Sequence, residues 1–211
     1  MGIDPGRLAV YVVTSEEGVP GRTHLDVARA AVVGGAGAVQ FRAPALDPAR
    51  AREAAAAVVA VCRAGGVLAI VNDDPDLAAA VDADGVHVGQ DDRPGAARAH
   101  LGAGRVIGVS VHTPDQARRA ADGGADYLGV TVWETPTKPE ARGVGLAGLE
   151  AIAGATHLPV VGIGGIHLGN AASVIAAGAA GVAVVSAVGA ADDPVAATRA
   201  LVAAIGVGAA R

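Results

Sequence analysis

Two clusters of carboxylate and amide side chains follow two short apolar runs near the middle of the chain. Residues 68–71 lead into Asn72, Asp73 and Asp74, and residues 85–88 lead into a second cluster at residues 90–92. A hard cation such as Mg²⁺ binds one or two carboxylates and completes its shell with water and phosphate oxygens. The matched clusters therefore predict a shared cation site. The alternative is that Asp, Asn and Gly simply favour turns.

A glutamine and an arginine end another apolar run, residues 38–41. Strand alternation places Gln40 and Arg42 on one face and Phe41 on the other. An inward arginine at a strand end binds phosphate through two parallel hydrogen bonds, whereas on the surface it would form an ordinary ion pair. Ser110 ends a further run, and His112 follows it either as a chemical group or as a neighbour of a helix cap.

A polar loop with two prolines is predicted over residues 133–145. It carries two hydroxyls and a lysine, Thr135, Thr137 and Lys138. Because proline stiffens the chain, these donors are presented with little loss of chain entropy, which suits a phosphate clamp. The alternative is a plain solvated loop.

Two further strand ends carry small residues, Gly164-Gly165 and Val185-Ser186. In barrels, the loops after the last two strands often hold phosphate with backbone N–H groups, although ordinary turns also contain glycine. Carboxylates with an arginine and a lysine suit a diphosphate, and a separate glycine-rich pocket suits a monophosphate. No nucleophile with an evident base stands out. The set predicts metal-assisted loss of pyrophosphate.

Eight repeats of an apolar run and a helical segment would bring these groups together. The predicted strands are residues 8–13, 38–41, 68–71, 85–88, 106–111, 127–132, 159–163 and 181–185. The predicted helices are residues 25–33, 47–64, 75–81, 94–100, 114–121, 146–153, 170–177 and 194–205. Eight such units most simply close into an α/β fold, a (β/α)8 TIM barrel of parallel strands, as a single domain over residues 1–211. The alternative is an open doubly wound sheet.

The composition limits the class of protein. The chain is 52% hydrophobic with mean hydropathy +0.43, but it has no apolar run long enough to span a bilayer and no basic, apolar N-terminal signal. A net charge of −5 argues against nucleic acid as a partner. The one cysteine, Cys62, is predicted to be a small buried residue. These features predict a cytoplasmic protein with no membrane partner.

The polar motifs follow one another in a specific order and spacing. They are Gln40-Phe41-Arg42, Asn72-Asp73, and residues 83–92, 108–113, 135–138, 162–166 and 184–186. Along almost its whole length the chain resembles the thiamine-phosphate synthase family. The resemblance implies a barrel transferase that joins 4-amino-2-methyl-5-hydroxymethylpyrimidine diphosphate to 4-methyl-5-(2-phosphoethyl)thiazole carboxylate or its decarboxylated phosphate. The products would be thiamine phosphate and pyrophosphate. Mg²⁺ is the implied cofactor, the implied ligands are small phosphorylated molecules, and a homodimer is compatible with it.

The resemblance also implies a role for each matching residue. The residues that would hold the diphosphate are Gln40, Arg42, Asn72 and Lys138. Mg²⁺ would be held by Asp73 and Asp92. The residues that would line the substrates or receive the thiazole phosphate are Ser110, Thr135, Thr137, Gly165, Val185 and Ser186. The residues expected to act in catalysis, in a dissociative mechanism that depends on electrostatic stabilisation and positioning, are Arg42, Ser110 and Lys138.

Three departures from the family pattern leave two alternatives open. Pro44 stands where the family usually has a lysine, and Asp74 stands where it usually has an arginine. Residues 133–135 also resemble the sister family of thiazole tautomerases, but residues 130–132 lack that family's catalytic histidine. The alternatives are a tautomerase-like isomerase, in which His112 would have to serve, and a non-catalytic binder of thiazole phosphate or thiamine phosphate.

Overall fold

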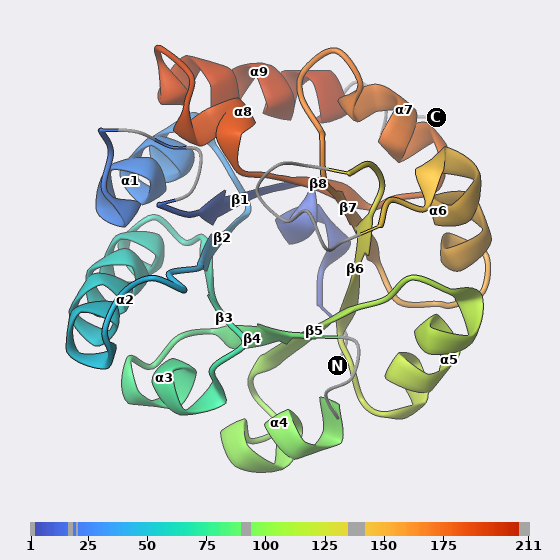
Figure 1. Cartoon of the computed structure of the whole chain (residues 1–211), viewed down its shortest axis with the longest axis horizontal. Helices are drawn as coiled ribbons and strands as arrows, with labels where there is room; N and C mark the ends of the chain where they lie inside the picture. The colour runs from blue at the N-terminus through green and yellow to red at the C-terminus, as the bar shows by residue number, and fades with distance from the viewer. Residues whose placement is uncertain (1–2, 17–18, 20, 90–93, 135–141, 207–211) are drawn as a thin grey trace.

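The computed structural model describes residues 3–16, 19, 21–89, 94–134 and 142–206. Eight parallel strands pair in sequence order and the eighth pairs with the first, so the sheet closes into a barrel (Figure 1). The strands are β1 (Val10–Thr14), β2 (Ala38–Phe41), β3 (Leu68–Asn72), β4 (Gly85–Val88), β5 (Val106–Ser110), β6 (Tyr127–Thr131), β7 (Val160–Ile163) and β8 (Gly181–Val184). The predicted (β/α)8 barrel is confirmed.

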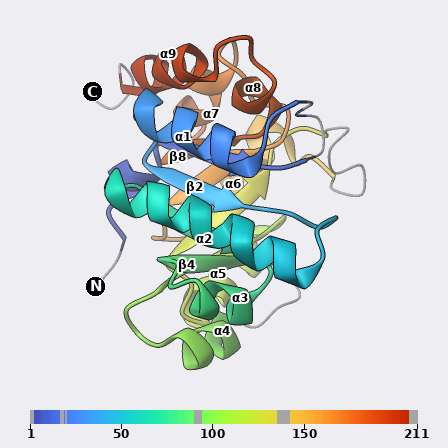
Figure 2. The ribbon, with the colours of Figure 1, turned by 90° about the vertical axis from the view of Figure 1, so that its left-hand side faces the viewer.

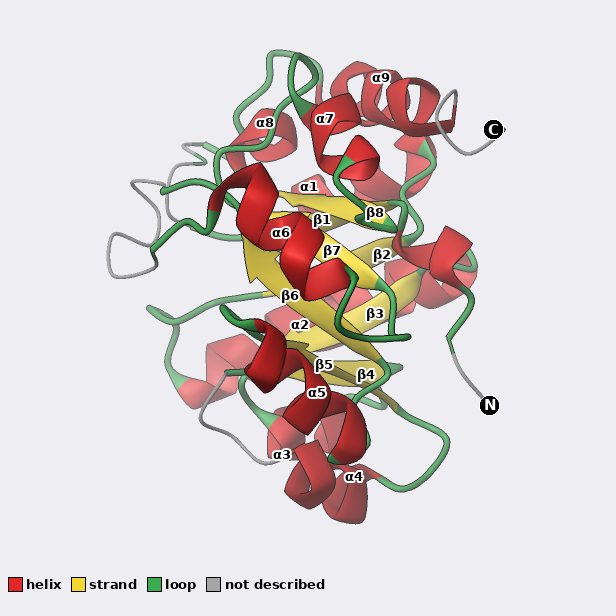
Figure 3. Cartoon of the chain, turned by 90° about the vertical axis from the view of Figure 1, so that its right-hand side faces the viewer, coloured by secondary structure: helices red, strands yellow, loops and turns green. Residues whose placement is uncertain are grey.

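Helices surround the closed sheet. They are α1 (His24–Gly34), α2 (Pro48–Ala64), α3 (Pro75–Ala80), α4 (Pro94–Leu101), α5 (Pro114–Asp122), α6 (Gly145–Ala153), α7 (Ala171–Ala176), α8 (Ser186–Gly189) and α9 (Pro194–Gly206). Figure 2 shows α1 and α2 side by side on one flank, and Figure 3 shows α5 and α6 on the other. Within the described part of the chain, none of the helices has the length and apolar character needed to cross a membrane.

Several helices begin and end where the sequence predicts. Asp47 before α2 and Asp74 before α3 accept hydrogen bonds from backbone N–H groups of the first turn, and a proline follows each of them. These caps satisfy donors that an isolated helix end leaves unpaired, and the proline lacks the N–H that would be unpaired at its position. Gly35 ends α1 in the left-handed conformation, with φ of 90°.

Strand alternation separates the inward side chains from those that pack under the helices. Val39, Val71 and Val109 are buried in the outer core between sheet and helices. The residues that form a second buried cluster inside the barrel are Leu8, Tyr11, Val13, Ala38, Leu68, Ile70, Tyr127, Val161 and Ala183. The barrel interior is therefore filled at its amino-terminal end.

A short 3-10 helix, η1 (Pro5–Leu8), lies at that end. Asp4 caps η1 by accepting the Gly6 N–H at 2.9 Å, and the Arg7 guanidinium donates to the Gly66 carbonyl at 3.1 Å. Leu8 is fully buried in the interior cluster. The prediction that the first strand starts at residue 8 is wrong, because Leu8 belongs to this turn and β1 starts two residues later.

Two aspartates each fix the start of one strand, β3 or β5, at the amino-terminal end of the barrel. The Asp84 carboxylate accepts the Ala69 N–H, and the Asp126 carboxylate accepts the Ile107 N–H, both at 2.7 Å. Asp126 also accepts a hydrogen bond from the Arg98 guanidinium of α4 at 2.6 Å. Hydrogen bonds to a charged group are stronger than neutral ones. They therefore hold the starts of β3 and β5 against the following loops.

Most of the predicted elements have bounds within two residues of the observed ones. The prediction missed η1 and α8, because each is only four residues long and shows no helical period. Cys62 is buried in α2 as predicted, and burial raises the pKa of its thiol to about 12.

Replacing Asp126 should destabilise the barrel without blocking its formation. Asp126→Ala removes the acceptor of the Ile107 N–H and of the partly buried Arg98 guanidinium, so the free energy of unfolding should fall by about 2–3 kcal/mol. Urea unfolding monitored by circular dichroism measures this difference. Asp122→Ala, which removes an exposed carboxylate at the end of α5, is the matched control and should be nearly neutral. Equal stability of the two variants would contradict the role assigned to Asp126.

Candidate active site

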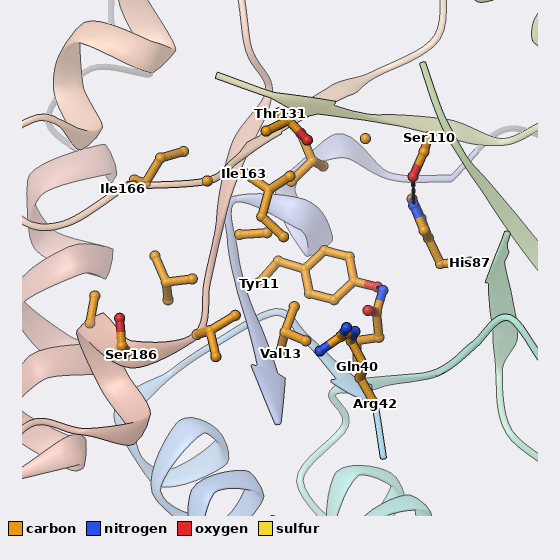
Figure 4. A pocket seen from close by; sticks show the side chains of 18 of the residues that line it. Tyr11, Val13, Gln40, Arg42, His87, Ser110, Thr131, Ile163, Ile166 and Ser186 are labelled. Carbon is orange, nitrogen blue, oxygen red and sulfur yellow. Dashed lines mark hydrogen bonds between the residues drawn. The ribbon is translucent and has the colours of Figure 1, made fainter. Parts of the chain in front are cut away.

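A cavity of about 390 Å³ is formed by inward residues of the strands and by the loops at their carboxyl-terminal ends (Figure 4). Seven of the residues predicted to bind substrate line it: Gln40, Arg42, Asn72, Ser110, Gly165, Val185 and Ser186. These residues come from strands spread over the whole chain. The expectation that the strand ends share one mouth is therefore confirmed.

Gln40 and Arg42 lie together on one side of the cavity (Figure 4). Phe41, between them, points away from the barrel interior and packs against the His24 imidazole, with 4.8 Å between ring centroids. The backbone N–H of Arg42 donates to the Thr14 carbonyl at 3.3 Å, so pairing with β1 continues to this residue. Alternation along a paired strand turns the guanidinium toward the cavity, where it can bind an anionic group.

Asn72 ends β3 and lines the cavity, and Asp73 follows it in the left-handed conformation, with φ of 57°. The Asp73 N–H donates to the His87 carbonyl at 2.8 Å, and the Asn72 amide donates to Asp73 Oδ2 at 2.7 Å. These two bonds fix an exposed carboxylate at the edge shared by β3 and β4. An exposed, oriented carboxylate is the type of ligand that Mg²⁺ prefers, so Asp73 fits the predicted metal role.

Five side chains form a continuous hydrogen-bonded chain below the cavity. Gln40 Nε2 lies 2.9 Å from Tyr11 Oη, which lies 2.9 Å from Tyr127 Oη. His87 then bridges Tyr127 Oη through Nδ1 and Ser110 Oγ through Nε2, each at 3.0 Å. Gln40 and Ser110, both predicted to bind substrate, are the two ends of this chain. Burial raises the pKa of Tyr11 and of Tyr127 well above the usual range, so both phenols keep their protons.

Two glycines make room for the rings of this chain. Gly108 pairs in register with His87 on one side and with Tyr127 on the other, and a Cβ at Gly108 would overlap the Tyr127 ring. A Cβ at Gly129 would lie 2.8 Å from Cε1 of His87. Side chains at either position would therefore displace the aromatic rings and break the chain.

The opposite side of the cavity is formed by the ends of β7 and β8. Gly164 and Gly165 have positive φ values of 91° and 64°, and Val185 and Ser186 lead into the short helix α8. In Figure 4, Ser186 lies across the cavity from His87 and Ser110. Barrels often bind phosphate at the loops after strands seven and eight, next to a short extra helix. This side therefore has the architecture expected for a phosphate pocket.

Four predicted site residues lie outside the described residues: Asp92, Thr135, Thr137 and Lys138. The described flanks of the loop that carries Thr135, Thr137 and Lys138 are fixed next to the cavity. Thr131 and Glu134 line the cavity, and the Val144 N–H donates to the Thr131 carbonyl at 3.0 Å. The loop predicted to clamp phosphate therefore leaves from the cavity wall and returns beside it.

The departures from the family pattern have local structural roles. Pro44 is exposed in a turn that the Leu46 N–H closes on the Ala43 carbonyl at 3.3 Å, and proline favours that position of a turn. Asp74 caps α3 by accepting the Leu77 N–H at 2.8 Å.

His112 is part of a helix cap and is not among the residues that line the cavity. Its N–H donates to Gln116 Oε1 at 2.7 Å, within the capping box that begins α5. In the strand where a tautomerase would carry its histidine, Thr131 faces the cavity, whereas Val130 and Val132 are buried in the outer core. None of these three positions supplies an acid–base group.

Three residues that were not predicted from the sequence line the cavity and form the middle of the hydrogen-bonded chain: Tyr11, His87 and Tyr127. Strand alternation could have indicated them, because it places these polar aromatic residues at inward-facing positions of β1, β4 and β6. The chain contains only two tyrosines, and both lie inside the barrel.

Comparisons with known proteins show the family of the chain. A family model described as thiamine monophosphate synthase matches residues 10–188. A thiamine-phosphate synthase of Roseiflexus castenholzii is 52% identical over 200 residues, covering 93% of this chain and 87% of that protein. One of Natronomonas pharaonis is 48% identical over 197 residues, covering 91% and 92%. The solved thiamine phosphate pyrophosphorylase of Pyrococcus furiosus superposes with a TM-score of 0.88 at 36% identity, covering 97% of this chain and 98% of that one. The chain belongs to the thiamine monophosphate synthase family.

Proposed function

We propose that this chain joins 4-amino-2-methyl-5-hydroxymethylpyrimidine diphosphate to 4-methyl-5-(2-phosphoethyl)thiazole or its carboxylate, and releases thiamine phosphate and pyrophosphate. With the carboxylate, carbon dioxide leaves as well. The observation that carries the proposal is the division of one cavity into two anion-binding sides. Arg42 and Gln40 form one side, and Gly165 with Ser186 forms the other. The substrates carry one diphosphate and one monophosphate, which match these two sides.

The apolar wall between the two sides fits the uncharged rings of the substrates. Val13, Val161 and Ile163 contribute to it from β1 and β7. Ligand pockets commonly combine such apolar walls with a few polar groups that fix orientation. Ser110 would orient the pyrimidine, and the pocket at Gly165 would hold the thiazole so that its ring nitrogen faces the reacting carbon.

The reaction breaks the bond between the exocyclic carbon of the pyrimidine and the diphosphate oxygen. Both electrons of that bond leave with pyrophosphate, and the thiazole nitrogen donates its lone pair to the same carbon. Arg42, together with Lys138 of the loop after β6, would stabilise the negative charge that grows on the departing group. The enzyme therefore contributes charge stabilisation and positioning.

Mg²⁺ is proposed as the cofactor, held by Asp73 and Asp92. When bound, it would neutralise charge on the diphosphate oxygens. Asp73 supports this assignment, because its exposed carboxylate is oriented by the Asn72 amide at the strand end next to the cavity. The cytoplasmic location and the homodimer stay predictions.

The two alternative functions are less well supported. A tautomerase-like isomerase needs an available acid–base group in the cavity. His112 instead belongs to the cap of α5, and both ring nitrogens of His87 are bonded to Tyr127 and Ser110. A non-catalytic binder was motivated by Pro44 and Asp74, which form a turn and cap a helix. Neither residue removes a group from the described cavity wall.

Turnover with both substrates tests the proposed function directly. The purified protein should release one pyrophosphate for each thiamine phosphate formed, and only when both substrates and Mg²⁺ are present. A coupled pyrophosphate assay with chromatographic detection of thiamine phosphate measures this ratio. Binding of either substrate without product formation would favour the non-catalytic alternative.

Removing the guanidinium of Arg42 should impair the chemical step. Arg42→Ala should lower kcat/KM by about 100-fold, because a preorganised donor that stabilises developing charge contributes on that order. Steady-state kinetics at varied diphosphate substrate measure the loss. Arg50→Ala, which removes an exposed arginine on α2, is the matched control and should retain activity. Equal activity of both variants would place Arg42 outside the reaction.

Replacing Asp73 by asparagine should weaken the response to Mg²⁺ while preserving the fold. Asparagine tolerates the left-handed φ of 57° and can still accept from Asn72, but it loses the charge that attracts the cation. The Mg²⁺ concentration giving half-maximal rate should rise by at least about tenfold. Asp74→Asn is the control, since asparagine caps helices as well as aspartate does. A Mg²⁺ response unchanged from that of the unmodified enzyme would argue against Asp73 as a ligand.

A further inference from the structure

In the hydrogen-bonded chain from Gln40 to Ser110, the donor and acceptor roles of neighbouring groups depend on one another. Tyr11 and Tyr127 are 2% and 0% exposed, and each phenol has one hydrogen to donate. A neutral imidazole carries its hydrogen on one ring nitrogen only, and both ring nitrogens of His87 have a partner in the chain. The direction of one hydrogen bond therefore decides the direction of the next.

With a neutral His87, only two arrangements give every bond of the chain one donor and one acceptor and also give each buried phenol hydrogen an acceptor. In the first, the Gln40 amide N–H donates to Tyr11, Tyr11 donates to Tyr127, and Tyr127 donates to Nδ1 of His87. His87 then donates from Nε2 to Ser110, whose own hydrogen is left for the cavity. In the second, the Gln40 amide oxygen accepts from Tyr11 and every bond reverses. Ser110 then gives its hydrogen to His87 and can only accept from a ligand.

Mixed arrangements are costly at this place. In a mixed arrangement, one pair of atoms has two hydrogens or none between them, or one phenol accepts from both neighbours while its own hydrogen has no acceptor. Buried polar groups are rarely left unpaired in this way. The rings have little freedom to move apart, because Tyr127 lies against Gly108 and His87 lies against Gly129. Close packing thus forces the chain to choose one of the two directions.

We infer that Tyr11, Tyr127 and His87 are positioning residues that couple the amide orientation of Gln40 to the hydrogen-bonding state of Ser110. The structure places Gln40 Nε2 against Tyr11 Oη, which selects the first direction. The Ser110 hydrogen is then available to a ligand acceptor such as a ring nitrogen, whereas in the second direction Ser110 has no hydrogen to offer. This inference rests on the proposed function for the identity of the ligand, but the hydrogen-bond order itself does not.

The tautomer of His87 reports the direction of the chain without any substrate. Two-bond ¹H–¹⁵N correlation spectra of the labelled full-length protein at pH 8.5, where an ordinary imidazole is neutral, show which ring nitrogen carries hydrogen. The chain has six histidines, so the His87 signals are assigned by their loss in His87→Gln. We expect Nε2–H. Hydrogen on Nδ1 in the unmodified protein would overturn the assigned direction, whether or not any variant folds.

Gln40→Glu should reverse the direction of every hydrogen bond in the chain that runs from residue 40 to Ser110. An ionised carboxylate can only accept from Tyr11, so the hydrogen of His87 should move from Nε2 to Nδ1, on the far side of both tyrosines. Tyr127→Phe in the same background cuts the chain and should abolish the change. Gln116→Glu, the same substitution at the cap of α5, should leave His87 unchanged. A His87 tautomer that does not respond to Gln40→Glu would overturn the coupling.

Kinetics separate positioning from a merely structural role. Tyr127→Phe should lower kcat/KM by about tenfold, as expected for the loss of one oriented hydrogen bond. If Tyr127 acts through Ser110, the double variant Tyr127→Phe/Ser110→Ala should be no slower than Ser110→Ala alone. Losses that multiply would overturn that route. An unmodified protein that forms no thiamine phosphate would refute the proposed function, while the tautomer result would still stand.

Discussion

The closing of the parallel hydrogen-bond ladder between β8 and β1 is the constraint on which the site depends. Closure brings the carboxyl-terminal ends of eight strands to one mouth, so residues separated by more than a hundred positions share a cavity. It also makes strand register decisive, because a shift of one residue would turn Arg42 or Ser110 outward and Phe41 or Val109 inward. The charged bonds of Asp84 and Asp126 hold that register at the opposite end.

The polar chain below the cavity combines two requirements that usually conflict. Buried polar groups need partners, and a substrate site needs groups that still have hydrogen-bonding capacity. Here the buried polar groups of Tyr11, Tyr127 and His87 find their partners by bonding to one another. The ends of the chain, Gln40 and Ser110, line the cavity. The barrel core thus supports the site and remains paired.

Most of the fold could be predicted from the sequence because strand and helix periods, caps and glycine stops all indicated the same eight units. The turn η1 and helix α8 could not, since four residues carry no period. At the site, Gln40, Arg42 and Ser110 could be placed from alternation. The link from Tyr11 through Tyr127 to His87 could not, because it depends on side-chain contacts across the barrel that no local pattern contains. The contacts of Asp92 and Lys138 stay predictions.

The glycines beside the aromatic rings mark the part of the barrel interior where a single substitution is poorly tolerated. Gly108 and Gly129 each lie within contact of a ring, so a larger residue at either position forces several partners to change together. Val13, Val161 and Ile163 lie on the apolar wall and engage no polar partner through their side chains. Efforts to adapt the cavity to a ligand of another size would therefore progress one substitution at a time on the wall. The ring-bearing residues of the hydrogen-bonded chain and the two glycines beside them would have to be replaced together.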